Sequence, residues 1–149
     1  MHISIKQFND EQKLWYGKLL VATIKADDVV DESELDYLIQ AFNFLKPDQK
    51  QLLSQLLKLP QQLPGLENIP EGLDPKQLLT IYTQLVMVSV ADTKLTVKEQ
   101  SFLNKVRSWF GFAGQLEKDL NQWTSDVLDL VKRRQQLLEA AHSAPPEAE

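Results

Sequence analysis

An acidic stretch in the first quarter of the chain holds the residues with the clearest chemical potential. The segment ADDVVDESELDYL, residues 26–38, contains six carboxylates and no basic residue. Carboxylate oxygens are hard ligands that suit Ca²⁺ or Mg²⁺. Acidic residues are also favoured in the first turn of a helix, where they meet the positive end of the helix dipole. The segment therefore supports two interpretations, a cation site or the start of a helix.

A second stretch, ADTKLTVKEQSFL at residues 91–103, repeats this pattern later in the chain. A single offset aligns Asp27 with Asp92 and Glu34 with Glu99, together with apolar residues on both sides. The shared pattern is a helix, then A-D-x-x-(V/L)-(D/T)-x-x-E, then a second helix. We infer an internal duplication in which each half is an antiparallel helical hairpin.

Both turns also carry the residues of a helix N-cap. Asp31 and Thr96 are good N-cap residues, and each is followed three residues later by Glu34 or Glu99. In a capping box the cap side chain accepts from the third helical amide, and the Glu accepts from the amide of the cap residue. This interpretation explains the acidic residues without a metal.

The alternative is a cation site of a kind other than an EF-hand. In the first copy, the first and third ligands of an EF-hand loop would be Thr23 and Lys25, and the usual glycine would be Asp28. Carboxylates of the first turn could instead converge, joined by those of the second turn if the two turns meet. The candidate ligands for Ca²⁺ or Mg²⁺ are Asp27, Asp31, Glu34, Asp92 and Glu99.

Composition argues against several other functions. A chain of 149 residues, 43% hydrophobic and 25% charged, suits one soluble domain. A net charge of −5 argues against nucleic-acid binding, and the lack of cysteine removes disulfides and thiolate sites. His2 and His142 have no neighbour at ligand spacing. A carboxylate-based enzyme is therefore the least supported alternative, and we expect a non-enzymatic protein with no certain cofactor.

Apolar residues recur at helical spacing along most of the chain, which predicts an all-α fold of six to seven helices. Asp74 and Pro75 suit the cap and first position of one helix, and Gly111 suits the end of another. The expected helices cover residues 10–25, 32–45, 46–59, 74–91 and 97–110, with a last helix from about residue 114.

We expect one compact domain over residues 1–141, with halves 10–58 and 74–141. The connector 59–73 holds three of the seven prolines and should be packed through its leucines. Residues 142–149 are expected to form a disordered tail. The last helix has apolar residues at four-three spacing, which we interpret as a core-packing stripe interrupted by Arg134: Leu116, Leu120, Trp123, Val127, Leu130 and Leu137.

The paired motifs resemble the tellurite-resistance TerB-like family, whose members carry ADG-x-(I/V)-x-x-x-E between two helices and repeat it in a second half. The corresponding stretches are ADDVVDESE and ADTKLTVKE, and Asp28 and Thr93 replace the family's glycine. The resemblance covers about residues 10–140. It implies an all-helical domain whose acidic residues have been proposed to bind metal. The implied acidic residues are Asp27, Glu34, Asp92 and Glu99.

The resemblance also implies a link to stress response, tellurite or phage resistance and membrane-associated complexes. We therefore expect an interaction module with a protein partner, in a stress-response or peripheral membrane complex. The alternative is a protein that binds or senses Ca²⁺ or Mg²⁺ through the acidic turns. The first ten residues lack the features of a signal peptide, and we expect a cytoplasmic location. The sequence leaves the oligomeric state open.

Overall fold

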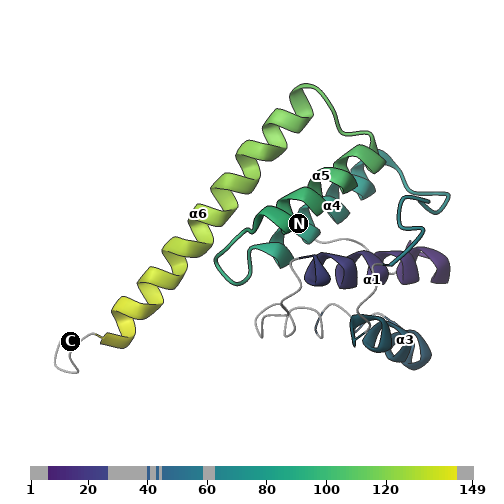
Figure 1. Cartoon of the computed structure of the whole chain (residues 1–149), viewed down its shortest axis with the longest axis horizontal. Helices are drawn as coiled ribbons and strands as arrows, with labels where there is room; N and C mark the ends of the chain where they lie inside the picture. The colour runs from purple at the N-terminus through teal and green to yellow at the C-terminus, as the bar shows by residue number, and fades with distance from the viewer. Residues whose placement is uncertain (1–6, 27–39, 41–42, 44, 59–62, 144–149) are drawn as a thin grey trace.

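The computed structural model describes residues 7–26, 40, 43, 45–58 and 63–143, and within these ranges it is helical, with no strand. This confirms the all-α prediction (Figure 1). The count of six to seven helices and the two related hairpins stay predictions, because most of residues 27–44 lie outside the described ranges. The helices are α1 (Asp10–Lys25), α3 (Pro47–Lys58), α4 (Pro75–Ser89), α5 (Val97–Phe110) and α6 (Gln115–Ser143).

The helix ends follow from local side-chain chemistry. Asn9 caps α1 and forms a capping box with Gln12, in which each side chain accepts from the other residue's backbone N–H. Asp74 caps α4 and Pro75 occupies its first turn, as predicted. Gly111 follows α5 with φ 77°, a left-handed conformation that suits a residue without Cβ. The capping predictions for Asp74, Pro75 and Gly111 are therefore confirmed.

The core is built around α1, which lies between α3 on one side and α4 and α5 on the other (Figure 1). A helix with neighbours on several sides must be apolar around most of its circumference. The second half of α1 meets this condition, since Leu19, Leu20 and Ile24 have no exposed surface. From α4 and α5, Leu85 and Leu103 are equally buried. The central position of α1 thus joins both halves of the chain in one core.

Two contacts fix α3 against α1. Gly17 lies inside α1, and a Cβ at this position would come within 2.4 Å of Cδ1 of the fully buried Leu53. A larger residue at position 17 would therefore require the Leu53 side chain to shift, and glycine avoids this although it lowers helix propensity by about 1 kcal/mol relative to alanine. At the end of α1, the Lys25 ammonium donates to the carbonyl oxygen of Leu56 at 3.0 Å. Burial lowers the pKa of this amine.

The connector is fastened to α1 through its described part, residues 63–73. The indole Nε1 of Trp15 donates to the carbonyl oxygen of Leu66 at 3.0 Å. The side-chain amide of Gln12 donates to the carbonyl oxygen of Glu71 at 2.8 Å. Leu66 is buried, and Leu63 is partly buried against the core. The prediction of a connector packed by its leucines is therefore confirmed for these residues.

Among the described residues, the long helix α6 packs against the rest of the fold through residues up to Val131. Leu120 and Thr124 are buried, and Arg107 of α5 donates to the side-chain oxygen of Asn121. Beyond residue 131 every described residue of α6 is exposed. The predicted core-packing stripe is thus correct for Leu120, Trp123 and Val127, and it is wrong for the three exposed leucines: Leu116, Leu130 and Leu137. Figure 1 shows the second half of α6 extending beyond the other helices.

The far end of α6 also bears on the predicted domain boundary. The helix includes His142 and Ser143, two residues past the expected end of the domain at residue 141. The remainder of the predicted tail lies outside the described residues. None of the helices in the described ranges combines the length and apolar character needed to cross a membrane.

Candidate functional site

The second acidic turn joins α4 to α5 and is closed by hydrogen bonds between its own residues. The amide of Thr93 donates to the carbonyl oxygen of Val90 at 2.9 Å, and the Asp92 carboxylate accepts from the amide of Lys94 at 3.0 Å. Thr93 has φ 67°, the left-handed region that glycine enters freely. Thr93 therefore keeps the tight turn at the position where the resembled family has glycine, at a conformational cost of about 1–2 kcal/mol.

Glu99 of the same motif is a buried capping residue. Its Oε1 accepts from the amide of Thr96 at 3.1 Å, while Oγ1 of Thr96 accepts from the amide of Glu99 at 3.1 Å. Only 1% of the Glu99 surface is exposed. The capping box predicted for the second copy is therefore confirmed. The burial of Glu99 was not expected from the sequence, because an acidic residue in a polar first turn indicates a surface position.

The candidate cation ligands are divided between described and undescribed parts of the chain. Asp92 and Glu99 lie at the turn between α4 and α5. The described residues contain no group of three or more His, Asp or Glu side chains that could hold a metal ion. A Ca²⁺ or Mg²⁺ site that uses the first turn stays a prediction, because three of the candidate ligands are outside the described ranges: Asp27, Asp31 and Glu34.

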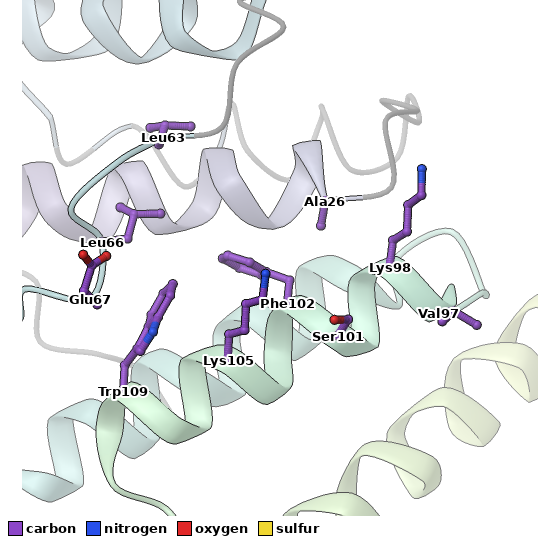
Figure 2. Close-up of a pocket in the computed structure, with 10 residues that line it drawn as sticks. All are labelled: Ala26, Leu63, Leu66, Glu67, Val97, Lys98, Ser101, Phe102, Lys105 and Trp109. Carbon is purple, nitrogen blue, oxygen red and sulfur yellow. The ribbon is translucent and has the colours of Figure 1, made fainter.

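A larger feature lies beside the second turn, a pocket of about 520 Å³ between three parts of the fold. A volume of this size is within the usual range for a binding site. One wall is a face of α5, another is the connector at residues 63–67, and the end of α1 contributes a third (Figure 2). The lining residues are Ala26, Leu63, Leu66, Glu67, Val97, Lys98, Ser101, Phe102, Lys105 and Trp109.

Helical spacing explains the wall that α5 supplies. Lys98, Phe102, Lys105 and Trp109 follow one another at intervals of three or four residues, which places them on one face of the helix. The Phe102 and Trp109 rings meet edge to face, with centroids 6.1 Å apart and planes at 84°. In Figure 2 the Lys105 side chain projects from α5 beside the Phe102 ring. The wall thus alternates cationic and aromatic side chains.

The opposite wall of the pocket comes from the connector. Leu63 and Leu66 add apolar surface, and Glu67 adds a carboxylate at the end nearest Trp109 (Figure 2). Two lysines against one glutamate make this pocket locally cationic, although the whole chain has a net charge of −5. Such a pocket is suited to a group that combines apolar surface with negative charge.

Sequence reasoning did not identify this pocket. The alternation of lysine and aromatic residues along 98–109 was a signal that could have pointed to the α5 wall. Nothing local indicated that residues 63–67 would lie opposite that wall, since this depends on the hydrogen bond between Trp15 and Leu66. The two carboxylates predicted as cation ligands in the second turn accept hydrogen bonds from backbone amides instead. Asp92 closes the turn and Glu99 caps α5.

These features define an all-helical domain in which a capped acidic turn adjoins an aromatic and cationic pocket. Residues 16–122, well over half of the chain, match the family described as tellurite resistance protein TerB. The chain belongs to this TerB family, as the paired motifs indicated. Neither the curated proteins nor the solved structures gave a significant match. The matched region ends within α6, so the exposed second half of that helix lies beyond it.

Proposed function

We propose that this chain is a non-enzymatic TerB-like interaction module whose pocket binds a segment of a partner protein. The observation that supports it is the pocket between α1, the connector and α5, with Phe102 and Trp109 in its wall and Lys98 and Lys105 beside them. Aromatic side chains in a depression supply most of the binding energy in many protein interfaces. The resemblance to the family leads us to propose a partner from a stress-response or membrane-associated complex.

The chemistry of the pocket specifies the kind of segment. An apolar or aromatic side chain would pack on the Phe102 and Trp109 rings, which are partly exposed. An adjacent carboxylate would interact with Lys105, whose ammonium is exposed. Rim charges mainly accelerate association and fix orientation, whereas the apolar contact limits dissociation. We therefore propose an acidic segment that contains a large apolar residue.

The charges of the pocket favour binding over catalysis. Catalytic acids and bases are commonly tuned by burial or by a close charged partner. Glu67, Lys98 and Lys105 are all exposed, so solvent surrounds the titratable groups that line the pocket. A group of this kind can attract a charged ligand without performing proton transfer. The non-enzymatic assignment rests on this exposure and on the binding surface beside it.

The experiment is affinity capture from native cells with matched variants of the full chain. Lys105→Glu reverses a charge inside the pocket, and Lys118→Glu makes the same change on an exposed part of α6 away from it. We expect the wild type and Lys118→Glu to capture the same protein, and Lys105→Glu and Trp109→Ala to lose it. Equal capture by all four chains would show that the pocket is not the binding site.

We further propose that a divalent cation modulates the module through the first acidic turn. The support is the concentration of six carboxylates without a basic residue in residues 26–38. Millimolar Ca²⁺ or Mg²⁺ should then raise the melting temperature, because a ligand that binds only the folded state stabilises it. The double substitution Asp27→Asn and Glu34→Gln should abolish the shift. An unchanged melting temperature in the wild type would contradict cation binding.

A further inference from the structure

The pocket beside α5 carries opposite charges at its two ends. Lys98 and Lys105 precede Trp109 on the α5 wall, whereas Glu67 of the connector lines the pocket at the Trp109 end (Figure 2). An acidic segment lying along the whole pocket would meet this carboxylate as a like charge, which is unfavourable. If the pocket binds a partner segment, as proposed above, Glu67 therefore needs a role of its own.

The Glu67 carboxylate is open to a ligand. It is exposed, and among the described residues it belongs to no ion pair. Lys105 lines the same pocket from the α5 wall and is also exposed, yet the two side chains form no salt bridge with each other. Two opposite charges thus line one pocket without neutralising each other. Each of them can interact with a charge of opposite sign on a bound segment.

Trp109 adds a second attractive group for a cation at the Glu67 end. Its indole is partly exposed. The edge-to-face contact with Phe102, at 6.1 Å between centroids, engages at most one face of each ring. At least one face of the indole is therefore not covered by Phe102. Cations are attracted to the face of an aromatic ring, and most strongly to that of tryptophan.

We propose that Glu67 and Trp109 form a subsite for a basic side chain of the partner segment. The segment then carries a basic residue on one side of its large apolar residue and an acidic residue on the other. The basic group lies between the indole and the Glu67 carboxylate, and the acidic group lies at Lys105. The charges of the segment are thus complementary to those of the pocket from one end to the other.

The dimensions of α5 set the spacing of these residues in the segment. Lys105 and Trp109 are four residues apart, which is about 6 Å along a helix. An extended chain advances about 3.3 Å per residue, so the acidic and basic residues should be roughly two to four positions apart. The wall from Lys98 to Trp109 is about 16 Å long, which roughly five extended residues can cover.

This subsite affects specificity more than affinity. A segment with only acidic residues is disfavoured at Glu67, and a segment with only basic residues is disfavoured at the two lysines of the α5 wall. Exposed ion pairs contribute little to affinity, and an exposed cation over an aromatic ring adds a comparable amount. We therefore expect Glu67→Gln to weaken binding of a matching segment only about threefold, and Glu67→Lys about tenfold.

Peptide selection tests this proposal without knowledge of the natural partner. Random twelve-residue peptides displayed on phage are selected for binding to the full chain, after those that also bind Trp109→Ala have been removed. The same selection is made on Glu67→Lys and on Glu71→Lys, a matched control at an exposed connector residue outside the pocket. We expect the wild type and Glu71→Lys to select an acidic and a basic residue on opposite sides of a large apolar residue. Glu67→Lys should select an acidic residue in place of the basic one.

A charge exchange then identifies the contact. Fluorescence anisotropy gives the affinity of a selected peptide, and of the same peptide with its basic residue replaced by glutamate. The altered peptide should bind Glu67→Lys better than it binds the wild type, a gain that a damaged fold cannot produce.

The possible failures are distinguishable. Peptides that require Lys105 but show no preference for a basic residue, or the same preference on Glu67→Lys, would overturn the subsite and leave the proposed function standing. If no selected peptide depends on Trp109, both the subsite and the pocket as a peptide-binding site are contradicted.

Discussion

The indole of Trp15 on α1 donates a hydrogen bond of 3.0 Å to the carbonyl oxygen of Leu66 in the connector. The two residues are 51 positions apart in the chain, and both are buried. The bond holds the connector against α1 and thereby places Leu66 in the wall of the pocket. One long-range contact thus links the hydrophobic core to the proposed binding surface.

Trp15→Phe should therefore destabilise the fold and loosen the pocket wall. The substitution leaves the buried Leu66 carbonyl without its donor, which costs about 1–3 kcal/mol, with a further contribution from lost packing. Urea denaturation measures the change, and hydrogen exchange should show faster opening of residues 63–66. Trp123→Phe is the control, because this indole is partly exposed and makes no hydrogen bond within the described residues. Equal destabilisation by the two substitutions would contradict the role given to the bond.

Thr93→Gly should stabilise the protein by roughly 0.5–1 kcal/mol. The left-handed conformation at φ 67° costs threonine about 1–2 kcal/mol, and the greater freedom of glycine in the unfolded chain removes part of the gain. Thr93→Ala is the control, since alanine keeps the Cβ that makes this conformation unfavourable. Thermal and urea unfolding both measure the difference. A glycine variant less stable than the alanine variant would show that the turn is not strained.

Glu99→Gln should preserve the fold, whereas Glu99→Ala should cost about 1–2 kcal/mol. Glutamine can fill the same place in a capping box, because its side-chain oxygen also accepts from the amide of Thr96. Alanine leaves that amide without its acceptor. Urea unfolding separates the two outcomes. If glutamine were as destabilising as alanine, the negative charge of Glu99 would matter beyond its role as a cap.

Tyr82 should make the fold sensitive to alkaline pH. Burial raises the pKa of its phenol, although the charge of Arg107 and a hydrogen bond with Thr124 act in the opposite direction. The ordinary pKa is about 10, so the contribution is fully present below pH 10. It is lost as pH rises through the higher pKa of the folded state, because the unfolded chain then releases the proton first.

Comparison with Tyr82→Phe isolates this effect. The phenylalanine variant cannot ionise, so its stability should fall less steeply above pH 10 than that of the wild type. Urea midpoints measured across alkaline pH give both curves, and other groups such as Lys25 contribute equally to each. Parallel curves would show that the phenol titrates alike in the folded and unfolded states.

The elements that local chemistry controls were predictable from the sequence. The limits of α1 and α5 agree with those expected from apolar spacing and from caps such as Thr96 and Gly111. Asp74 and Pro75 likewise identified the start of α4. These signals act within a few residues, so one sequence contains them completely. The TerB family followed from the paired motifs and is confirmed by the match over residues 16–122.

Features that depend on distant contacts were not predictable in the same way. The pocket requires the connector to lie opposite α5, and the burial of Glu99 requires surrounding helices at that turn. Leu130 and Leu137 are exposed, unlike the rest of the predicted core stripe beyond Leu120, because the body ends before α6 does. Periodicity identifies the apolar face of a helix but not how far along that face a neighbouring element extends.

The close approach of Gly17 and Leu53 has a consequence for sequence variation. A Cβ at position 17 would occupy the space that Cδ1 of Leu53 now fills, so the two positions share one fixed volume. A larger residue at position 17 displaces the Leu53 side chain, so Gly17→Ala should be tolerated better together with Leu53→Val than alone. The spacing of α1 and α3 at this contact therefore depends on the combined size of the side chains at positions 17 and 53, and not on either residue alone.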